Sequence, residues 1–234
     1  MAKYRLKFNL SDGSQIDAGE IVIPMPVKGV DYFTEADKAE LFAEILNYKA
    51  IAINSFAATP STAEMGSTVS SVTLSWAINK TPTALTLDGA TIGVVEHPKT
   101  VTGTFTSNKT WTLKATDERG AESTKTATLS FLNGVYYGVA TQPSVYDSAF
   151  ILGLTKNLRS SKLTSFSANA GSGQYIYYCL PKRMGTCAFK VGGFDGGFSL
   201  VKTIPFTNAS GYTEDYYMYR SDNAGLGQTA VTVS

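Results

Sequence analysis

Histidine, cysteine and charged residues are scarce in this 234-residue chain. It contains one histidine and two cysteines, and only 17% of its residues are charged. Any serine or cysteine nucleophile that a histidine activates must therefore use His97. His97 lies between Glu96 and Pro98 in a polar stretch, which favours an exposed loop residue over a catalytic base. A zinc site is disfavoured too, because it needs about four ligands.

Further absences exclude other classes of protein. No run of about 18 apolar residues exists, so no membrane insertion is expected. The segment 1–5 leads into alternating residues and not into an apolar stretch, so we predict no signal peptide and synthesis in a cytoplasm. The net charge is +1 with lysine and arginine scattered singly, which argues against nucleic-acid binding. No phosphate-binding loop, zinc-protease motif or EF-hand is present. We predict no cofactor, no metal and no enzymatic activity.

The two cysteines, Cys179 and Cys187, lie close together in a strand-like stretch. In a chain without an export signal, free buried thiols are favoured. A disulfide across a hairpin stays open, because the sequence does not give the Cα separation that such a bond requires.

Tyrosine and glycine are abundant, with 13 and 21 residues. Together with many threonines, they favour a mainly β fold. We predict an N-terminal hairpin plus one helix, then an immunoglobulin-like β-sandwich, then a C-terminal β-rich domain.

Residues 1–54 are predicted to be an attachment or oligomerisation segment. Alternating apolar residues indicate a hairpin over 3–24 with its turn at 11–14. Thr34 is a candidate N-cap for a helix whose apolar stripe is Leu41, Phe42, Ile45 and Leu46. One helix beside one hairpin makes a thin core, so we expect this segment to dock on a neighbour or on a copy of itself.

Residues 55–132 are predicted to form the immunoglobulin-like sandwich, from several short strands at roughly 8–12-residue spacing. The alternating apolar positions are Val72, Leu74, Trp76, Ile78, Leu85, Leu87, Ile92, Val94, Trp111, Leu113, Ala115, Ala127, Leu129 and Phe131. Asp88-Gly89 and 117–120 are predicted turns. Asn133-Gly134 is taken as a break in the chain before the last domain.

Residues 133–234 are predicted to be a second, independent β domain with strands near 174–180, 186–191, 198–206, 214–219 and 229–233. The glycine-rich segment 192–197 resembles a phosphate loop, but it lies between strand-like stretches and is predicted to be a turn. Asp195, Glu214 and Asp215 allow a glycosidase pair only if the fold brings two of them about 5–9 Å apart.

Tyrosine is dense in this last region. The candidate interface or glycan contacts are Tyr177, Tyr212, Tyr216, Tyr217 and Tyr219. Tyrosine offers a flat apolar face with a polar tip, which suits sugar rings and protein interfaces alike. Core and subunit contact is the favoured interpretation of these residues, and a receptor-facing patch is the alternative.

Three stretches carry a family resemblance. Residues 4–14, leading to Asp17-Ala18-Gly19, resemble the N-termini of phage tail-associated proteins. Residues 73–76 and 111–121 resemble the immunoglobulin-like modules of phage surface proteins. Residues 177–185 are similar to C-terminal domains of phage tail-tip, fibre and baseplate proteins.

The resemblance implies a virion structural protein, most simply a tail, baseplate or short-fibre component. Its expected partners are other virion proteins, further copies of itself with a trimer favoured, and a host cell-surface glycan or protein. One alternative is a head or tail-tube decoration protein without a receptor role. The other is a glycan-cleaving tail enzyme.

Overall fold

The computed structural model describes residues 2–9, 15–23, 48–95 and 97–234, and the side chains from residue 48 onward within these ranges. The chain is mainly β and divides into two compact units, Met1–Ala50 and Ile51–Ser234, which are described separately. No helix in the described ranges has the length and apolar character needed to cross a membrane.

The first unit contains an antiparallel hairpin of β1 (Ala2–Asn9) and β2 (Gln15–Ile23). The predicted N-terminal hairpin is therefore confirmed. The turn predicted at 11–14 and the helix predicted after Thr34 lie outside the described residues.

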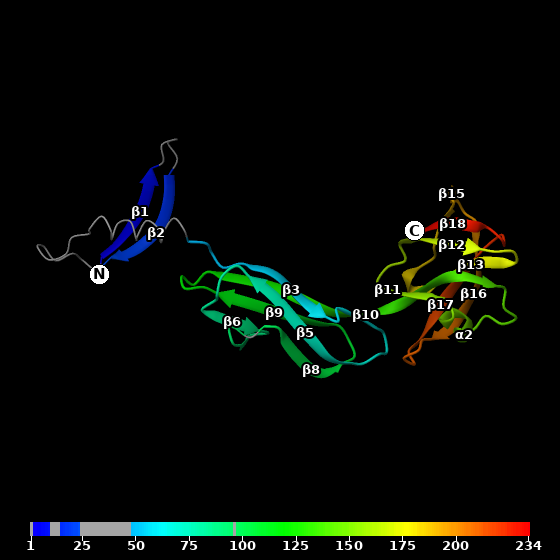
Figure 1. Cartoon of the computed structure of the whole chain (residues 1–234), viewed down its shortest axis with the longest axis horizontal. Helices are drawn as coiled ribbons and strands as arrows, with labels where there is room; N and C mark the ends of the chain where they lie inside the picture. Colours follow the sequence, from blue (N-terminus) through cyan, green and yellow to red (C-terminus); the bar gives the residue numbers. More distant parts are fainter. Residues whose placement is uncertain (1, 10–14, 24–47, 96) are drawn as a thin grey trace, which may run out of the picture. The chain divides into compact units, whose positions relative to one another are not determined.

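The second unit begins with a β-sandwich, which we call the first lobe (residues 51–132). Its strands are β3 (Ile53–Thr59), β4 (Thr62–Glu64), β5 (Val69–Ile78), β6 (Ala84–Leu87), β7 (Ala90–Thr91), β8 (Lys99–Phe105), β9 (Lys109–Thr116) and the first half of β10 (Glu122–Thr141). One sheet has the order β3-β5-β8, and the facing strands have the order β10-β9-β6-β7 (Figure 1). This is the A-B-E and C-F-G division of an immunoglobulin-like sandwich, as predicted.

Strand alternation builds the core of the first lobe. The inward positions form one buried cluster that includes Val72, Leu74, Trp76, Leu85, Leu87, Trp111, Leu113, Ala115, Ala127, Leu129 and Phe131. Thr73 and Ser75 point the other way, because successive side chains of a strand face opposite sides. The Asp88-Gly89 turn has positive φ at both residues, the geometry of a tight two-residue hairpin. The return strand is shorter than predicted: β7 ends at Thr91, and Val94 is exposed.

Asp117 fixes the hairpin between β9 and β10. Its Oδ1 accepts hydrogen bonds from the backbone N–H groups of Arg119 and Ala121, both at 2.9 Å. Its Oδ2 accepts one from the N–H of Ile51 at 3.1 Å and lies 3.1 Å from the Lys80 ammonium. A buried carboxylate is stable only with such partners, so Asp117 connects the turn to the start of the lobe.

The break predicted at Asn133-Gly134 is wrong. Both residues lie inside β10, where Asn133 pairs with Arg159 and Gly134 with Leu158. A Cβ on Gly134 would lie 2.6 Å from the ring of Tyr136. The glycine therefore makes room for an aromatic ring and does not form a turn.

The second lobe (residues 133–234) is built on the other half of β10. Its remaining elements are α2 (Ser148–Leu152), β11 (Thr155–Arg159), β12 (Thr164–Ala170), β13 (Gln174–Pro181), η1 (Lys182–Met184), β14 (Phe189–Val191), β15 (Phe194–Asp195), β16 (Phe198–Thr207), β17 (Thr213–Ser221) and β18 (Gly227–Val233). One sheet contains the strands β16-β17-β13-β10 as successive neighbours, and β11 also pairs with β10. A second sheet has the order β12-β18-β14-β15.

The central sheet of the second lobe is covered on both faces. One face packs on residues of the β12-β18-β14 sheet, including Phe166, Phe189 and Val231. The other packs on the segment around α2, through Phe150 and Ile151. Alternation therefore sends Ile176, Tyr178 and Leu180 into one core and Tyr177 and Cys179 into the other. The high tyrosine density of this lobe follows from one sheet supplying two cores.

Candidate contact site on the second lobe

Three of the five predicted contact tyrosines are interior residues, so that prediction is corrected for them. Tyr177, Tyr216 and Tyr219 are 0%, 2% and 4% exposed. A buried ring presents no surface to a glycan or to another subunit. Tyr177 and Tyr216 belong to the core beneath α2, and Tyr219 belongs to the core on the opposite face.

The hydroxyl groups of these tyrosines serve the fold. Tyr216 donates to the carbonyl oxygen of Gly134 at 2.8 Å, and the Tyr219 oxygen accepts from the Cys187 N–H at 3.1 Å. The Tyr177 and Tyr146 hydroxyl oxygens are 3.4 Å apart. Burial raises the pKa of all three core phenols above its ordinary value, because an ionised phenolate is poorly solvated inside a core.

The other two tyrosines, Tyr212 and Tyr217, are half-buried. Tyr212 lies between β16 and β17, and its N–H donates to Asn208 Oδ1 at 3.0 Å. Tyr217 lies on β17, and its ring meets the Tyr219 ring edge to face at 6.2 Å between centroids. Among the described residues, the Tyr217 hydroxyl makes no hydrogen bond. The Tyr217 hydroxyl is therefore available to form a hydrogen bond with a ligand.

Tyr217 lines a surface hollow that we call the Tyr217 hollow. Its volume is about 510 Å³, and its lining consists of Lys182, Arg183, Glu214, Asp215 and Tyr217. The sequence places the first two residues some thirty positions from the last three. They meet because Pro181, at the end of β13, pairs with Tyr216 on β17, and η1 then turns the chain over that strand.

The two carboxylates of the hollow are held differently. Glu214 is tightly fixed: Oε1 lies 2.6 Å from Arg183 Nε, and Oε2 accepts from Asn133 Nδ2 at 2.6 Å. Arg183 also donates to Asn133 Oδ1, which closes a three-residue network. Within the described ranges, the one charged partner of the Asp215 carboxylate is Lys182 at 3.9 Å, and both side chains are more than half exposed. An exposed ion pair at that distance contributes little to the free energy of folding. Asp215 and Lys182 can therefore give up their contact and bind a ligand instead.

Of the three carboxylates considered for glycoside cleavage, Glu214 and Asp215 line the same hollow, and Asp195 lies apart from them. Asp195 lies on β15 in the second sheet, where its carboxylate is 3.4 Å from Lys190, and it does not line the Tyr217 hollow. Glu214 is engaged by Arg183 and Asn133. The turn predicted at 192–197 is confirmed only for Gly192 and Gly193, which join the paired strands β14 and β15 with positive φ, whereas Phe194 and Asp195 form β15 itself.

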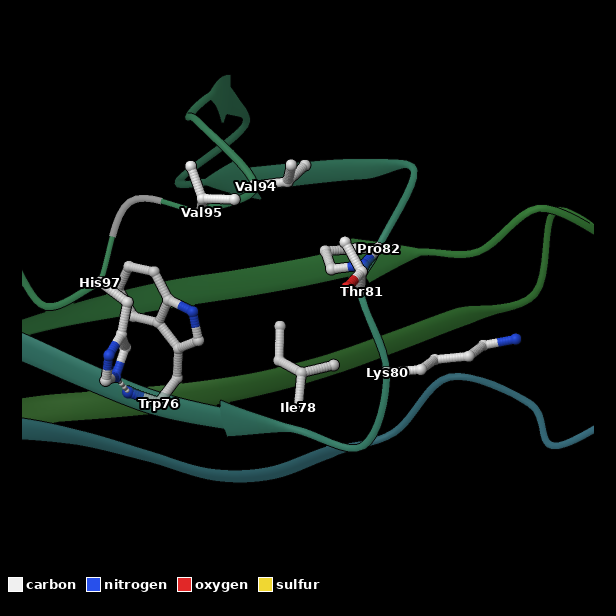
Figure 2. A pocket seen from close by; sticks show the side chains of 8 residues that line it. All are labelled: Trp76, Ile78, Lys80, Thr81, Pro82, Val94, Val95 and His97. Carbon is white, nitrogen blue, oxygen red and sulfur yellow. Dashed lines mark hydrogen bonds between the residues drawn. The ribbon is translucent and has the colours of Figure 1, made fainter.

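His97 is exposed, as predicted, and its ring contacts Trp76 of the first lobe. Its Nε2 accepts a hydrogen bond from the Trp76 backbone N–H at 2.9 Å, and its ring lies edge-on to the indole at 5.0 Å (Figure 2). It borders an open hollow of about 360 Å³ together with Trp76, Ile78, Lys80, Thr81, Pro82, Val94 and Val95. The Nε2 lone pair is occupied by the strand, so that nitrogen is not available to take a proton from a nucleophile.

Both cysteines are free thiols, as favoured from the sequence. Cys179 lies in the core beneath α2, whereas Cys187 packs against the core on the other face of the sheet. Burial raises the pKa of both thiols, that of Cys187 to about 11. In the described part of the chain, no three His, Cys, Asp or Glu side chains form a cluster that could hold a metal ion.

Part of this site could not be found from the sequence. Tyr217 was identified by aromatic density, and Glu214 and Asp215 by charge. Lys182, Arg183 and Asn133 carry no local signal for it, because they reach the hollow only through strand pairing and the β10 register.

No protein-family model and no curated protein matches this chain. Two solved structures are weakly similar to it, each at 10% sequence identity. One contains the N-terminal eight Ig domains of Down Syndrome Cell Adhesion Molecule, with a TM-score of 0.24 over 75% of this chain. The other is the Streptomyces avermitilis alpha-L-rhamnosidase complexed with L-rhamnose, with a TM-score of 0.26 over 78% of this chain. The match spans 23% of the length of each of those chains.

Proposed function

We propose that this chain is a structural component of a bacteriophage virion, in the tail, the baseplate or a short fibre, and that it is not an enzyme. The resemblance of residues 4–19, 73–76, 111–121 and 177–185 to phage proteins motivates the proposal. In it, the unit Met1–Ala50 attaches the chain to the particle, and the second lobe contacts the host surface or a neighbouring subunit.

The observation that carries the proposal is the single strand β10, whose 20 residues supply both lobes. Its first half pairs with β9 in the first lobe, and its second half pairs with β11 and β13 in the second. A continuous strand transmits position and force between lobes better than a flexible linker does. Such a connection suits a protein that holds a contact surface at a fixed place on a particle, where repeated copies add weak contacts by avidity.

Immunogold labelling tests the location. Antibodies raised against residues 51–234 should label phage particles released from cells that produce this chain, at the tail or its tip. Labelling spread over the head would instead support the decoration alternative, and particles without any label would overturn the proposal.

The mass in solution tests the role of the N-terminal unit. Light scattering should show an oligomer for the full chain, with a trimer favoured, and a monomer for a chain that begins at Ile51. A full-length monomer would mean that the first unit needs other virion proteins. An oligomer that survives removal of residues 1–50 would contradict the assigned role of that unit.

A further inference from the structure

We infer that the Tyr217 hollow is a binding site for a neutral saccharide. The inference rests on the proposed function, because it names the ligand class of the second lobe's contact surface. It uses the side chains Lys182, Arg183, Glu214, Asp215 and Tyr217.

The aromatic platform is the first element of the site. Tyr217 and Asp215 are two residues apart on β17, so their side chains leave the same face of the strand, while Tyr216 between them is buried on the other face. The Tyr217 ring is half-buried and edge-packed on Tyr219, which holds its orientation. A fixed ring with a free hydroxyl can pack against the apolar face of a sugar and contact an edge hydroxyl.

The charges around the platform define the class of ligand. Two cations, Lys182 and Arg183, face two anions, Glu214 and Asp215, so the formal charges cancel. A strongly anionic or cationic ligand would gain from one pair and be repelled by the other. Sugar hydroxyls both donate and accept hydrogen bonds. One sugar can therefore donate to a carboxylate and accept from an ammonium group at the same time.

The hollow also combines fixed and available groups. Arg183, Glu214 and Asn133 form a closed network that sets its wall. Lys182 and Asp215 are 3.9 Å apart and mostly exposed, so their donors and acceptors remain accessible. A volume of about 510 Å³ lies within the usual range for small-ligand sites, and the open, shallow form of the hollow predicts weak single-site binding.

Saturation-transfer NMR on the full chain tests the inference. The probes are glucose, galactose, N-acetylglucosamine and rhamnose, each titrated to about 10 mM, a range suited to weak binding. At least one probe should bind, and Tyr217→Ala and Asp215→Asn should each weaken that binding about tenfold or more.

The chain offers matched controls. Asp195→Asn also neutralises an exposed aspartate that is paired with a lysine, here Lys190, but it lies outside the hollow. Tyr212→Phe removes the hydroxyl of the other half-buried tyrosine among the five predicted contacts. Both variants should bind the probe as the parent chain does, and circular dichroism checks that every variant is folded.

Three results would overturn the inference. One is no saturable binding of any probe, and another is equal binding by the hollow and control variants. The third is a change of mass in solution caused by Tyr217→Ala, which would identify the hollow as a subunit contact. Immunogold labelling that persists without sugar binding would leave the proposed virion role intact, so the two failures are distinguishable.

Discussion

At the residue scale, Gly66 shows how one absent side chain brings the two lobes together. It has a φ of +85°, and a Cβ built on it would lie 2.5 Å from the Cβ of Tyr212 in the second lobe. Next to it, the carbonyl oxygen of Met65 accepts from Asn208 Nδ2 at 2.8 Å. The close approach of the two backbones at this point requires glycine, both for its conformation and for its size.

Gly66→Ala is expected to lower the free energy of unfolding by about 2–5 kcal/mol, the sum of left-handed strain and steric overlap. Urea denaturation followed by circular dichroism measures the change. The control is Gly120→Ala, because Gly120 has a φ of +79° and no atom of the described part of the chain lies within 4 Å of its Cβ position. The Gly120→Ala variant should lose only the free energy of placing alanine in a left-handed backbone conformation, about 1–2 kcal/mol. Equal losses in the two variants would show that the contact with Tyr212 adds nothing.

Single residues also show why part of the structure could not be predicted. Asp88-Gly89 was correctly assigned to a turn, because its local sequence decides its conformation. Asn133-Gly134 has a similar local signal, yet tertiary packing against Tyr136 keeps it in a strand. Core or subunit contact was the favoured interpretation of the five tyrosines, but the sequence did not separate the buried Tyr177, Tyr216 and Tyr219 from the other two, because composition does not say which faces of a sheet are covered.

At the scale of the element, β13 shows why the second lobe is harder to predict than the first, because both of its faces are buried. In β5 and β9 apolar and polar residues alternate, so one face of each strand is apolar. This pattern made the sandwich of the first lobe predictable. β13 is apolar on both faces, so its pattern gives a strand but not the layers that cover it. The helix α2, which covers one of those faces, is five residues long and shows no amphipathic repeat that would predict it.

This doubly covered sheet predicts cooperative unfolding in alkali. Burial raises the pKa of five tyrosines above the ordinary value of 10: Tyr136, Tyr177, Tyr178, Tyr216 and Tyr219. Below pH 10 the folded and unfolded chains both keep these protons. Above it the unfolded chain loses protons that the folded chain retains, so stability falls as pH rises, by at most about 1.4 kcal/mol per pH unit for each tyrosine.

Ultraviolet absorbance of tyrosinate, recorded together with far-ultraviolet circular dichroism, measures this effect. The β-structure should persist at pH 10, because the five buried tyrosines keep their protons there. These five tyrosines should ionise together with the loss of β-structure at higher pH. A single smooth ionisation near pH 10 with unchanged circular dichroism would contradict the burial of these phenols.

At the scale of the whole molecule, the two lobes of residues 51–234 are joined by more than β10. Glu64 of the first lobe lies 2.8 Å from the Lys156 ammonium and 3.3 Å from the Tyr136 hydroxyl, both in the second lobe. β4 pairs in parallel with β10 at Ser130–Leu132, next to the start of the second lobe. These contacts, with those of Met65 and Gly66, make independent unfolding of either lobe costly, because it would break the shared strand and its partners.

We therefore expect residues 51–234 to unfold in one transition, and the sequence supplies a separate probe for each lobe. Both tryptophans, Trp76 and Trp111, lie in the first lobe, and every tyrosine of this unit lies at or beyond Tyr136. Urea curves from tryptophan fluorescence and from the near-ultraviolet dichroism of tyrosine should coincide, since coincident probes are the mark of two-state unfolding. Curves with separate midpoints would show that the lobes are independent domains, and β10 would then be only a connector. A shared midpoint that splits in Gly66→Ala would identify the contact with Tyr212 as the element that couples them.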